Sequence, residues 1–263
     1  MDKPSFYWGI ASYHRIDRQP MLQNLVKMGY APHEIILSTQ TQEDYDQYRE
    51  KWGEIATVIY REGHNVSENK NTILDYLRVN YGNVRVVMCS DKVRAVNRMT
   101  RNKKLMPIES REEMDGLVKA AFFAAKRINA SIWGVAPVSN TFYMDRSMST
   151  NLFLLGCFMG ILDATKTHFD PEQPLKEDWE IGLREIAEGG RTLRLNDVCL
   201  TATFHTKGGA HEAWNTEGDR LNRECTEKLL GQYPELVKPH ATRQNELRYV
   251  GKTDKIKTSI FDL

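Results

Sequence analysis

Residues 84–93 read VRVVMCSDKV, an apolar run that gives way to polar and charged residues at its end. This pattern is typical of a buried strand followed by the loop that leaves a sheet. Three more apolar runs precede it, and each is followed by a segment with helical periodicity. The predicted strands are residues 6–11, 34–38, 55–60 and 84–88, and the predicted helices are residues 19–28, 43–52 and 66–80. This alternation predicts an α/β fold with a mostly parallel central sheet flanked by helices.

The ends of these strands predict where a ligand binds. In a parallel sheet the carboxyl ends of the strands meet at one edge, and ligands bind there. Polar residues follow three of the predicted strands, at 12–15, 38–41 and 89–92. We therefore expect these three segments to lie on one rim.

The second half of the chain is less regular. Its predicted helices are residues 111–129 and 178–188, its predicted strands are 132–137, 151–161 and 198–203, and a turn follows at 205–209. It contains no internal repeat, low-complexity segment or linker. The simplest organisation is one domain over residues 1–263, with a nucleotide-binding half at about 1–104 and an acceptor-binding half at about 105–263.

The composition excludes several classes of protein. With 263 residues, of which 41% are hydrophobic, the chain can bury a substantial core. The uncharged apolar stretch at residues 151–162 is shorter than the roughly 20 apolar residues of a membrane span. The first residues lack a secretory signal pattern, so we expect a cytoplasmic protein. The four cysteines show no metal-binding spacing, which indicates reduced thiols and no structural zinc.

The charge is nearly balanced overall, at +1, but it is uneven along the chain. Residues 92–104 include six basic side chains and no acidic one, and residues 238–257 are also mostly basic. The six are Lys92, Arg94, Arg98, Arg101, Lys103 and Lys104. Such a run is consistent with contacts to the phosphates of DNA, and equally with a solvated surface.

Seven short motifs occur in a characteristic order. They are SYHR at 12–15, NKN within 65–77, VVMCSDKV at 86–93, IWGVAPVSN at 132–140, NLFLLGCFMGI at 151–161, KEDWE at 176–180 and HTKGG at 205–209. With these motifs, most of the chain resembles the TET-associated glycosyltransferases. Members of this GT-A-like family, found in phages and kinetoplastids, glucosylate hydroxymethylated pyrimidine bases in DNA. The resemblance implies a GT-A-like nucleotide-sugar-binding fold, a UDP-sugar donor, inversion at the sugar, and double-stranded modified DNA, such as phage DNA, as the acceptor.

The motif after the fourth strand departs from the family pattern. GT-A enzymes usually carry Asp-x-Asp there, whereas this chain has Ser90, Asp91 and Lys92. Mg²⁺ or Mn²⁺ would need carboxylates near the diphosphate, so a divalent cation is in doubt, with Asp91 and His205 as its candidate ligands. Lys92 could instead neutralise the diphosphate directly. The alternative is that Asp91 caps a turn and Lys92 is solvated.

The resemblance also implies a catalytic base. The acceptor hydroxyl must lose a proton as it attacks the sugar, and the family likeness assigns this role to Asp178 of KEDWE, with Glu177 as the second candidate. The alternative is that both carboxylates stabilise the dipole of a helix N-terminus.

The remaining candidates concern the nucleotide and the sugar. The nucleotide-sugar contacts implied by the resemblance are Ser12, Tyr13, Arg15, Lys70, Asn71, Asp91, Lys92, Trp133, Gly134, His205, Lys207, Gly208 and Gly209. Asn140 and residues 156–160 are expected to line the donor-sugar or acceptor pocket with Trp133 and Gly134. Core packing and ordinary turns are the alternatives for all of them. Two other functions also stay open: extension of a sugar already on DNA or on a glycan, and an inactive DNA-binding relative.

Overall fold

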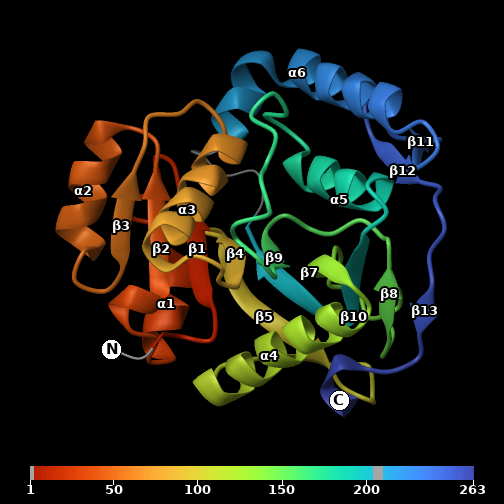
Figure 1. Ribbon diagram of the computed structural model, residues 1–263, viewed down its shortest axis with the longest axis horizontal. Helices are drawn as coiled ribbons and strands as arrows, with labels where there is room; N and C mark the ends of the chain where they lie inside the picture. Colours follow the sequence, from red (N-terminus) through yellow and green to blue (C-terminus); the bar gives the residue numbers. More distant parts are fainter. Residues whose placement is uncertain (1–2, 204–209) are drawn as a thin grey trace.

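The computed structural model describes residues 3–203 and 210–263 of the chain, with side chains described outside 210–217. Most of the described strands belong to one twisted sheet that runs through the molecule (Figure 1). Along its main path the strand order is β13-β8-β10-β7-β9-β4-β1-β2-β3, and β5 and β6 extend it beside β10. A separate ribbon is formed by β11 (Val237–Pro239) and β12 (Leu247–Tyr249).

The first half of the sheet is parallel, as the alternating pattern predicts. Its strands are β1 (Tyr7–Ala11), β2 (Ile35–Thr39), β3 (Thr57–Tyr60) and β4 (Val86–Ser90). The helices between them are α1 (Pro20–Lys27), α2 (Gln42–Trp52) and α3 (Val66–Tyr81), with the short 3-10 helix η1 (Pro32–Glu34) before β2. All four strands run in the same direction, so their carboxyl ends share one edge.

Both faces of this sheet are buried, which explains the continuous apolar runs. Trp8 and Ile10 of β1 pack with α1, α2 and α4 (Arg111–Arg127) on one face. Tyr7 packs on the other face with apolar residues of α3 and α5 (Glu177–Ala187). Successive side chains of a strand point to opposite faces, so one strand serves both cores.

The second half mixes strand directions. The strands are β5 (Val93–Met99), β6 (Leu105–Pro107), β7 (Ala130–Ala136), β8 (Met148–Thr150), β9 (Phe158–Ile161), β10 (Arg191–Ala202) and β13 (Lys255–Ile256). β9 is antiparallel to both β4 and β7, so β7 runs parallel to β4. Helix α6 (Ala210–Gln232) lies across the top of Figure 1, and its Leu229 packs against Leu183 of α5. The described chain ends in a 3-10 helix, η2 (Ile260–Asp262).

The structure corrects two boundaries and adds several elements. The strand expected at 151–161 covers only Phe158–Ile161, because residues 151–157 form the loop that leads to the site. The strand expected at 198–203 begins earlier, at Arg191. The charged run after Lys92 forms the hairpin β5–β6, and α6 was not predicted at all. No helix in the described ranges is long and apolar enough to cross a membrane.

Candidate active site

A cavity of about 480 Å³ opens at the carboxyl edge of the parallel strands. This volume lies in the range of roughly 300–1,000 Å³ that is usual for small-molecule sites. Its walls come from the ends of β1, β2 and β4, the start of α3, the loop before β9 and the start of α5, with one residue from α6. The predicted rim is therefore confirmed for 89–92 and, within 12–15, for Ser12, Tyr13 and Arg15, and the segment 38–41 contributes Gln40.

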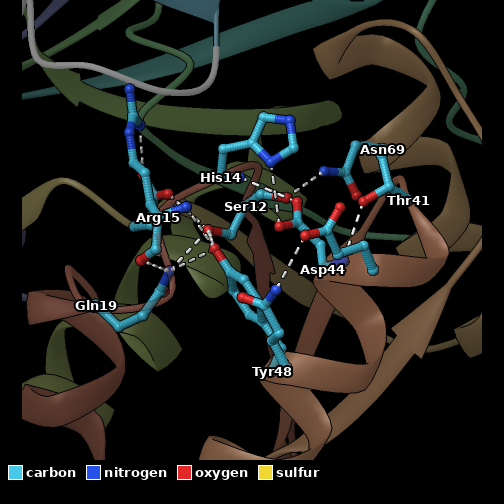
Figure 2. A network of polar contacts seen from close by, with 11 residues as sticks. Ser12, His14, Arg15, Gln19, Thr41, Asp44, Tyr48 and Asn69 are labelled. Atoms are coloured by element: carbon cyan, nitrogen blue, oxygen red, sulfur yellow. Dashed lines mark hydrogen bonds and ion pairs between the residues drawn. The ribbon is translucent and has the colours of Figure 1, made fainter.

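One wall of the cavity is a closed polar network, part of which Figure 2 shows. The Arg15 guanidinium lies 3.0 Å from Oδ1 of Asp91, and the Ser12 hydroxyl donates to Oδ2 of Asp91 at 2.8 Å. Ser12 in turn accepts from the Gln19 amide at 2.7 Å, and the Tyr48 hydroxyl accepts from the Arg15 backbone at 2.9 Å. Asp91 is only 1% exposed. This network fixes the loop after β1 onto the end of β4.

The same contacts bear on metal binding. Each oxygen of Asp91 accepts one hydrogen bond, from Arg15 or from Ser12, and the Arg15 guanidinium already compensates its negative charge, which weakens its attraction for a further cation. Among the described residues, no group of three or more His, Cys, Asp or Glu side chains could hold a metal ion. The second candidate ligand, His205, lies outside the described residues. The pair of Asp91 and His205 therefore stays a prediction.

A second wall of the cavity contains a buried lysine and two carboxylates. Lys70, on the first turns of α3, is 6% exposed, and its Nζ lies 2.8 Å from Oε1 of Glu177. The same ammonium lies 3.4 Å from the Gly156 carbonyl and 4.8 Å from the centre of the Phe169 ring. Lys70 therefore ties α3 to the start of α5, and it compensates the charge of Glu177.

Asp178 sits beside this pair in a different electrostatic setting. Burial, and then the negative charge of Glu177, raise the pKa of Asp178 to about 7, although hydrogen bonds from backbone amides and the charge of Lys70 oppose the shift. Its Oδ2 accepts a hydrogen bond of 3.0 Å from the Gly156 amide. A carboxylate with a pKa near neutrality is a stronger base than an exposed aspartate.

Local geometry explains why these residues approach so closely. A Cβ at Gly156 would lie 2.8 Å from the Cβ of Asp178, so only glycine allows this contact. Lys176, just before α5, has a φ of +60°, a left-handed conformation that is uncommon for residues other than glycine. Its ammonium lies 3.4 Å from Glu246. The chain therefore enters α5 through a turn that presents Glu177 and Asp178 at the first helical positions.

Two further residues add positive charge or a thiol to the cavity. Lys92 lines it, directly after Asp91. Burial raises the pKa of Cys157 to about 11, although the charges of Lys92 and Lys70 act in the opposite direction. Cys157 is therefore a neutral thiol near pH 7 and not a nucleophile.

Most of the predicted catalytic and nucleotide-sugar-binding residues that the structure describes line this cavity. They are Ser12, Tyr13, Arg15, Lys70, Asp91, Lys92, Glu177 and Asp178. His205, Lys207, Gly208 and Gly209 lie outside the described residues.

Three predicted residues lie elsewhere. Asn71 exchanges hydrogen bonds of 2.8 and 2.9 Å with the backbone of Phe169, so its amide supports a loop. Trp133 is completely buried against Phe158, and Gly134 faces Leu154. The expectation that these three residues contact the nucleotide-sugar is corrected, because they are engaged in core packing and loop contacts.

Apart from Lys70, the sequence analysis did not identify the cavity residues around the start of α3. Asn65 caps this helix by accepting from the Glu68 amide at 3.0 Å, and both Asn65 and His64 line the cavity. Asn69 also lines it, and its amide donates to the Ser12 carbonyl at 3.0 Å (Figure 2). An asparagine cap before a helical pattern could have signalled this edge, because helix N-termini attract anions.

The basic run lies on the hairpin formed by β5 and β6. Arg94, Arg101, Lys103 and Lys104 are exposed, and Arg98 is half-buried with its guanidinium 3.6 Å from Glu113. Arg101 lies 3.9 Å from Asp262. The hairpin therefore presents cations to solvent, as both a DNA contact and a solvated surface require.

Comparisons with known proteins agree with this fold. A search of curated proteins finds no significant match. Among solved structures, the mannosyltransferase PcManGT from Pyrobaculum calidifontis, in complex with GDP-Man and Mn²⁺, is 14% identical with a TM-score of 0.56, over 88% of this chain and 65% of that one. TarS from S. aureus is 12% identical with a TM-score of 0.50, over 86% and 40%. This chain thus spans less than two thirds of either protein, and at such identities the likeness concerns the fold alone.

The sequence itself provides the more specific relationship. The model of a family described as TET-Associated Glycosyltransferase matches residues 10–209, more than half of the chain. The matched region includes both walls of the cavity, from Ser12 to Asp178. The chain therefore belongs to the TET-associated glycosyltransferase family and has the fold of a GT-A-like glycosyltransferase.

Proposed function

We propose that this protein transfers a sugar from a UDP-sugar to the hydroxymethyl group of a modified pyrimidine, 5-hydroxymethylcytosine or 5-hydroxymethyluracil, in double-stranded DNA. The observation that carries the proposal is Asp178, a carboxylate with a raised pKa on the wall of a cavity at the strand ends. Family membership supports the sugar transfer, and the basic hairpin supports a nucleic-acid acceptor.

The donor diphosphate fits the positive side of this cavity. The start of α3 provides backbone amides and the positive end of a helix dipole, and Lys92 adds a full positive charge nearby. Fixed positive groups of this kind stabilise the charge that develops on a leaving diphosphate. Ser12 and Tyr13, at the end of β1, are the candidates for contacts to the uridine.

In the reaction, the acceptor oxygen attacks the anomeric carbon of the sugar. The new carbon–oxygen bond forms as the bond to the UDP oxygen breaks, and UDP leaves with that electron pair. The proton of the acceptor hydroxyl passes to the carboxylate of Asp178. Attack from the face opposite UDP inverts the anomeric configuration.

Glu177 and Lys70 have a supporting role in this scheme. Lys70 lies 2.8 Å from Glu177 and compensates part of its charge, and the negative charge of Glu177 raises the pKa of Asp178. The pair therefore adjusts the base without taking the proton itself.

In this scheme the reaction depends less on a divalent cation than it does in GT-A enzymes with Asp-x-Asp. A bound cation would add Lewis-acid stabilisation of the diphosphate. Among the described residues, the candidate carboxylate for such a cation is Asp91, which is paired with Arg15.

The direct experiment is mass spectrometry of nucleosides after incubation of the enzyme with DNA and a panel of UDP-sugars. The DNA substrates carry hydroxymethylcytosine, hydroxymethyluracil, unmodified bases or bases that are already glycosylated. We expect a hexosyl or pentosyl adduct on a hydroxymethylated base. Products only from the glycosylated DNA would instead show a transferase that extends an existing sugar. Absence of product with every acceptor, together with absence of UDP-sugar hydrolysis, would show an inactive relative.

A further inference from the structure

Two aromatic side chains project from the segment that joins β7 to β8. Phe142 is 78% exposed and Tyr143 is 73% exposed, and their rings contact each other edge to face at 5.1 Å. Asn140 holds the turn that carries them. Its side chain accepts from the Phe142 amide and its carbonyl accepts from the Tyr143 amide, both at 3.0 Å. Large aromatic rings held in solvent by an ordered turn are candidates for contact with a partner.

This aromatic turn, residues 140–143, leaves the sheet beside the active site. β7 runs parallel to β4, so the segment after Ala136 starts at the same edge as the strand ends of the main cavity. A second cavity of about 320 Å³ lies there, lined in part by Val138, Asn140 and Leu155. Leu155 directly precedes Gly156, which contacts Asp178 in the main cavity. The second cavity is thus the neighbour of the site where the acceptor hydroxyl must react.

The other end of the turn reaches the basic hairpin. Met144, which follows the two aromatic residues, packs in one buried cluster with Met99 of β5 and Leu105 of β6. Between those two residues the hairpin turn exposes Arg101, Lys103 and Lys104. A continuous series of neighbouring segments therefore leads from the proposed catalytic base, Asp178, through the second cavity and the aromatic turn to the cations of the hairpin.

We propose that the aromatic turn binds a nucleobase of the DNA acceptor by stacking, while the hairpin cations hold the adjoining phosphates. The proposal rests on the proposed function, since it assumes a DNA acceptor. Aromatic rings for bases, combined with cations for the backbone, are the general means of holding single-stranded or locally opened nucleic acid. A base that reacts inside the cavity must leave its stack, and exposed rings beside the cavity can replace the lost stacking.

The test compares Phe142→Ala and Tyr143→Ala with the control Phe123→Ala. Phe123 is a 56% exposed aromatic residue on α4, outside both cavities. Titrations with fluorescent duplex DNA containing hydroxymethylcytosine measure Kd, and steady-state assays measure KM for this DNA and Kd for UDP. We expect each turn variant to weaken DNA binding about fivefold to a hundredfold, the range for loss of one base–aromatic stack. Kd for UDP should not change, and the control should behave as wild type.

A conservative variant separates stacking from folding. Phe142→Trp retains a large ring and should restore DNA affinity, while all variants should keep the wild-type melting temperature. Wild-type DNA affinity in Phe142→Ala and Tyr143→Ala would overturn this inference and leave the proposed function intact. A wild-type protein that neither binds nor modifies DNA would contradict both.

Discussion

The two walls of the active-site cavity each contain a buried cation paired with a carboxylate, but the pairs differ in what surrounds them. On one wall, Arg15 and Ser12 occupy both oxygens of Asp91. On the other wall, Lys70 pairs with Glu177, and Asp178 beside them has a raised pKa. The difference suits Asp91 to hold the rim together, and the raised pKa of Asp178 supports our proposal that it takes the proton.

The largest effect on kcat should come from removing the negative charge of Asp178, in comparison with removing that of Asp91. Asp178→Asn removes the base and should lower kcat by about 100-fold or more, with the Kd for UDP nearly unchanged. Asp91→Asn leaves Arg15 without its charged partner, and it should reduce stability and UDP affinity more than it reduces kcat. Steady-state kinetics with isothermal titration of UDP measure both. Equal losses of kcat in the two variants would remove the distinction between the walls.

The second prediction concerns the lysine that supports Asp178. Lys70→Met leaves the carboxylate of Glu177 buried without its cation, so we expect a loss of roughly 3–5 kcal/mol in the free energy of unfolding. Lys228→Met is the matched control, because its partner Asp170 is more exposed and the pair lies outside the cavity. That change should cost about 1 kcal/mol or less. Urea unfolding measures both.

Lys70→Met should also change the pH dependence of the rate, which a purely structural role of Lys70 would not. The charge of Lys70 lowers the pKa of Asp178, so its removal should raise this pKa. The acid limb of the rate profile should then move to higher pH. An unmoved limb in a folded variant would show that Lys70 acts through packing alone.

The third prediction tests the hairpin cations. Lys103→Glu/Lys104→Glu changes two exposed side chains that lie outside the cavity. DNA affinity should fall about tenfold or more at low salt, and the dependence of log Kd on log salt should lose a slope of about 2. The donor Kd should not change. Unaltered DNA binding in this variant would identify the run as a solvated surface.

The smallest effect concerns divalent metal. Wild-type activity should fall only a fewfold in EDTA, because Arg15 already compensates the charge of Asp91 and Lys92 supplies a positive charge to the diphosphate. Lys92→Ala should increase this sensitivity. Complete loss of wild-type activity in EDTA, restored by Mn²⁺, would show that a metal remains essential.

The parts of this architecture that the sequence predicts are those with local signals. Each strand and helix of the first 90 residues has its own apolar period, and the strand-end rule then places Ser12 and Asp91 on one rim. The β5–β6 hairpin was not predicted, because its many charged residues obscure the alternation of apolar and polar residues that indicates a strand.

Contacts between distant segments could not be predicted in this way. Lys70 meets Glu177 across 107 positions of sequence, and no local pattern encodes that distance. Neighbours in sequence also diverge in space. Lys70 points into the cavity while Asn71 contacts the Phe169 loop, because successive side chains of a helix point in different directions.

The most direct test of the account is the pH dependence of kcat/KM for sugar transfer to hydroxymethylated DNA, by wild type and Asp178→Asn. The base must be ionised to accept the proton, and burial with the charge of Glu177 raises the pKa of Asp178 to about 7. For wild type we therefore predict a rate that falls about tenfold per pH unit below pH 7 and levels off above it. The residual rate of Asp178→Asn should lack this limb. A wild-type rate that stays constant from pH 5 to pH 8, or an unchanged limb in Asp178→Asn, would contradict the assignment of Asp178 as the base.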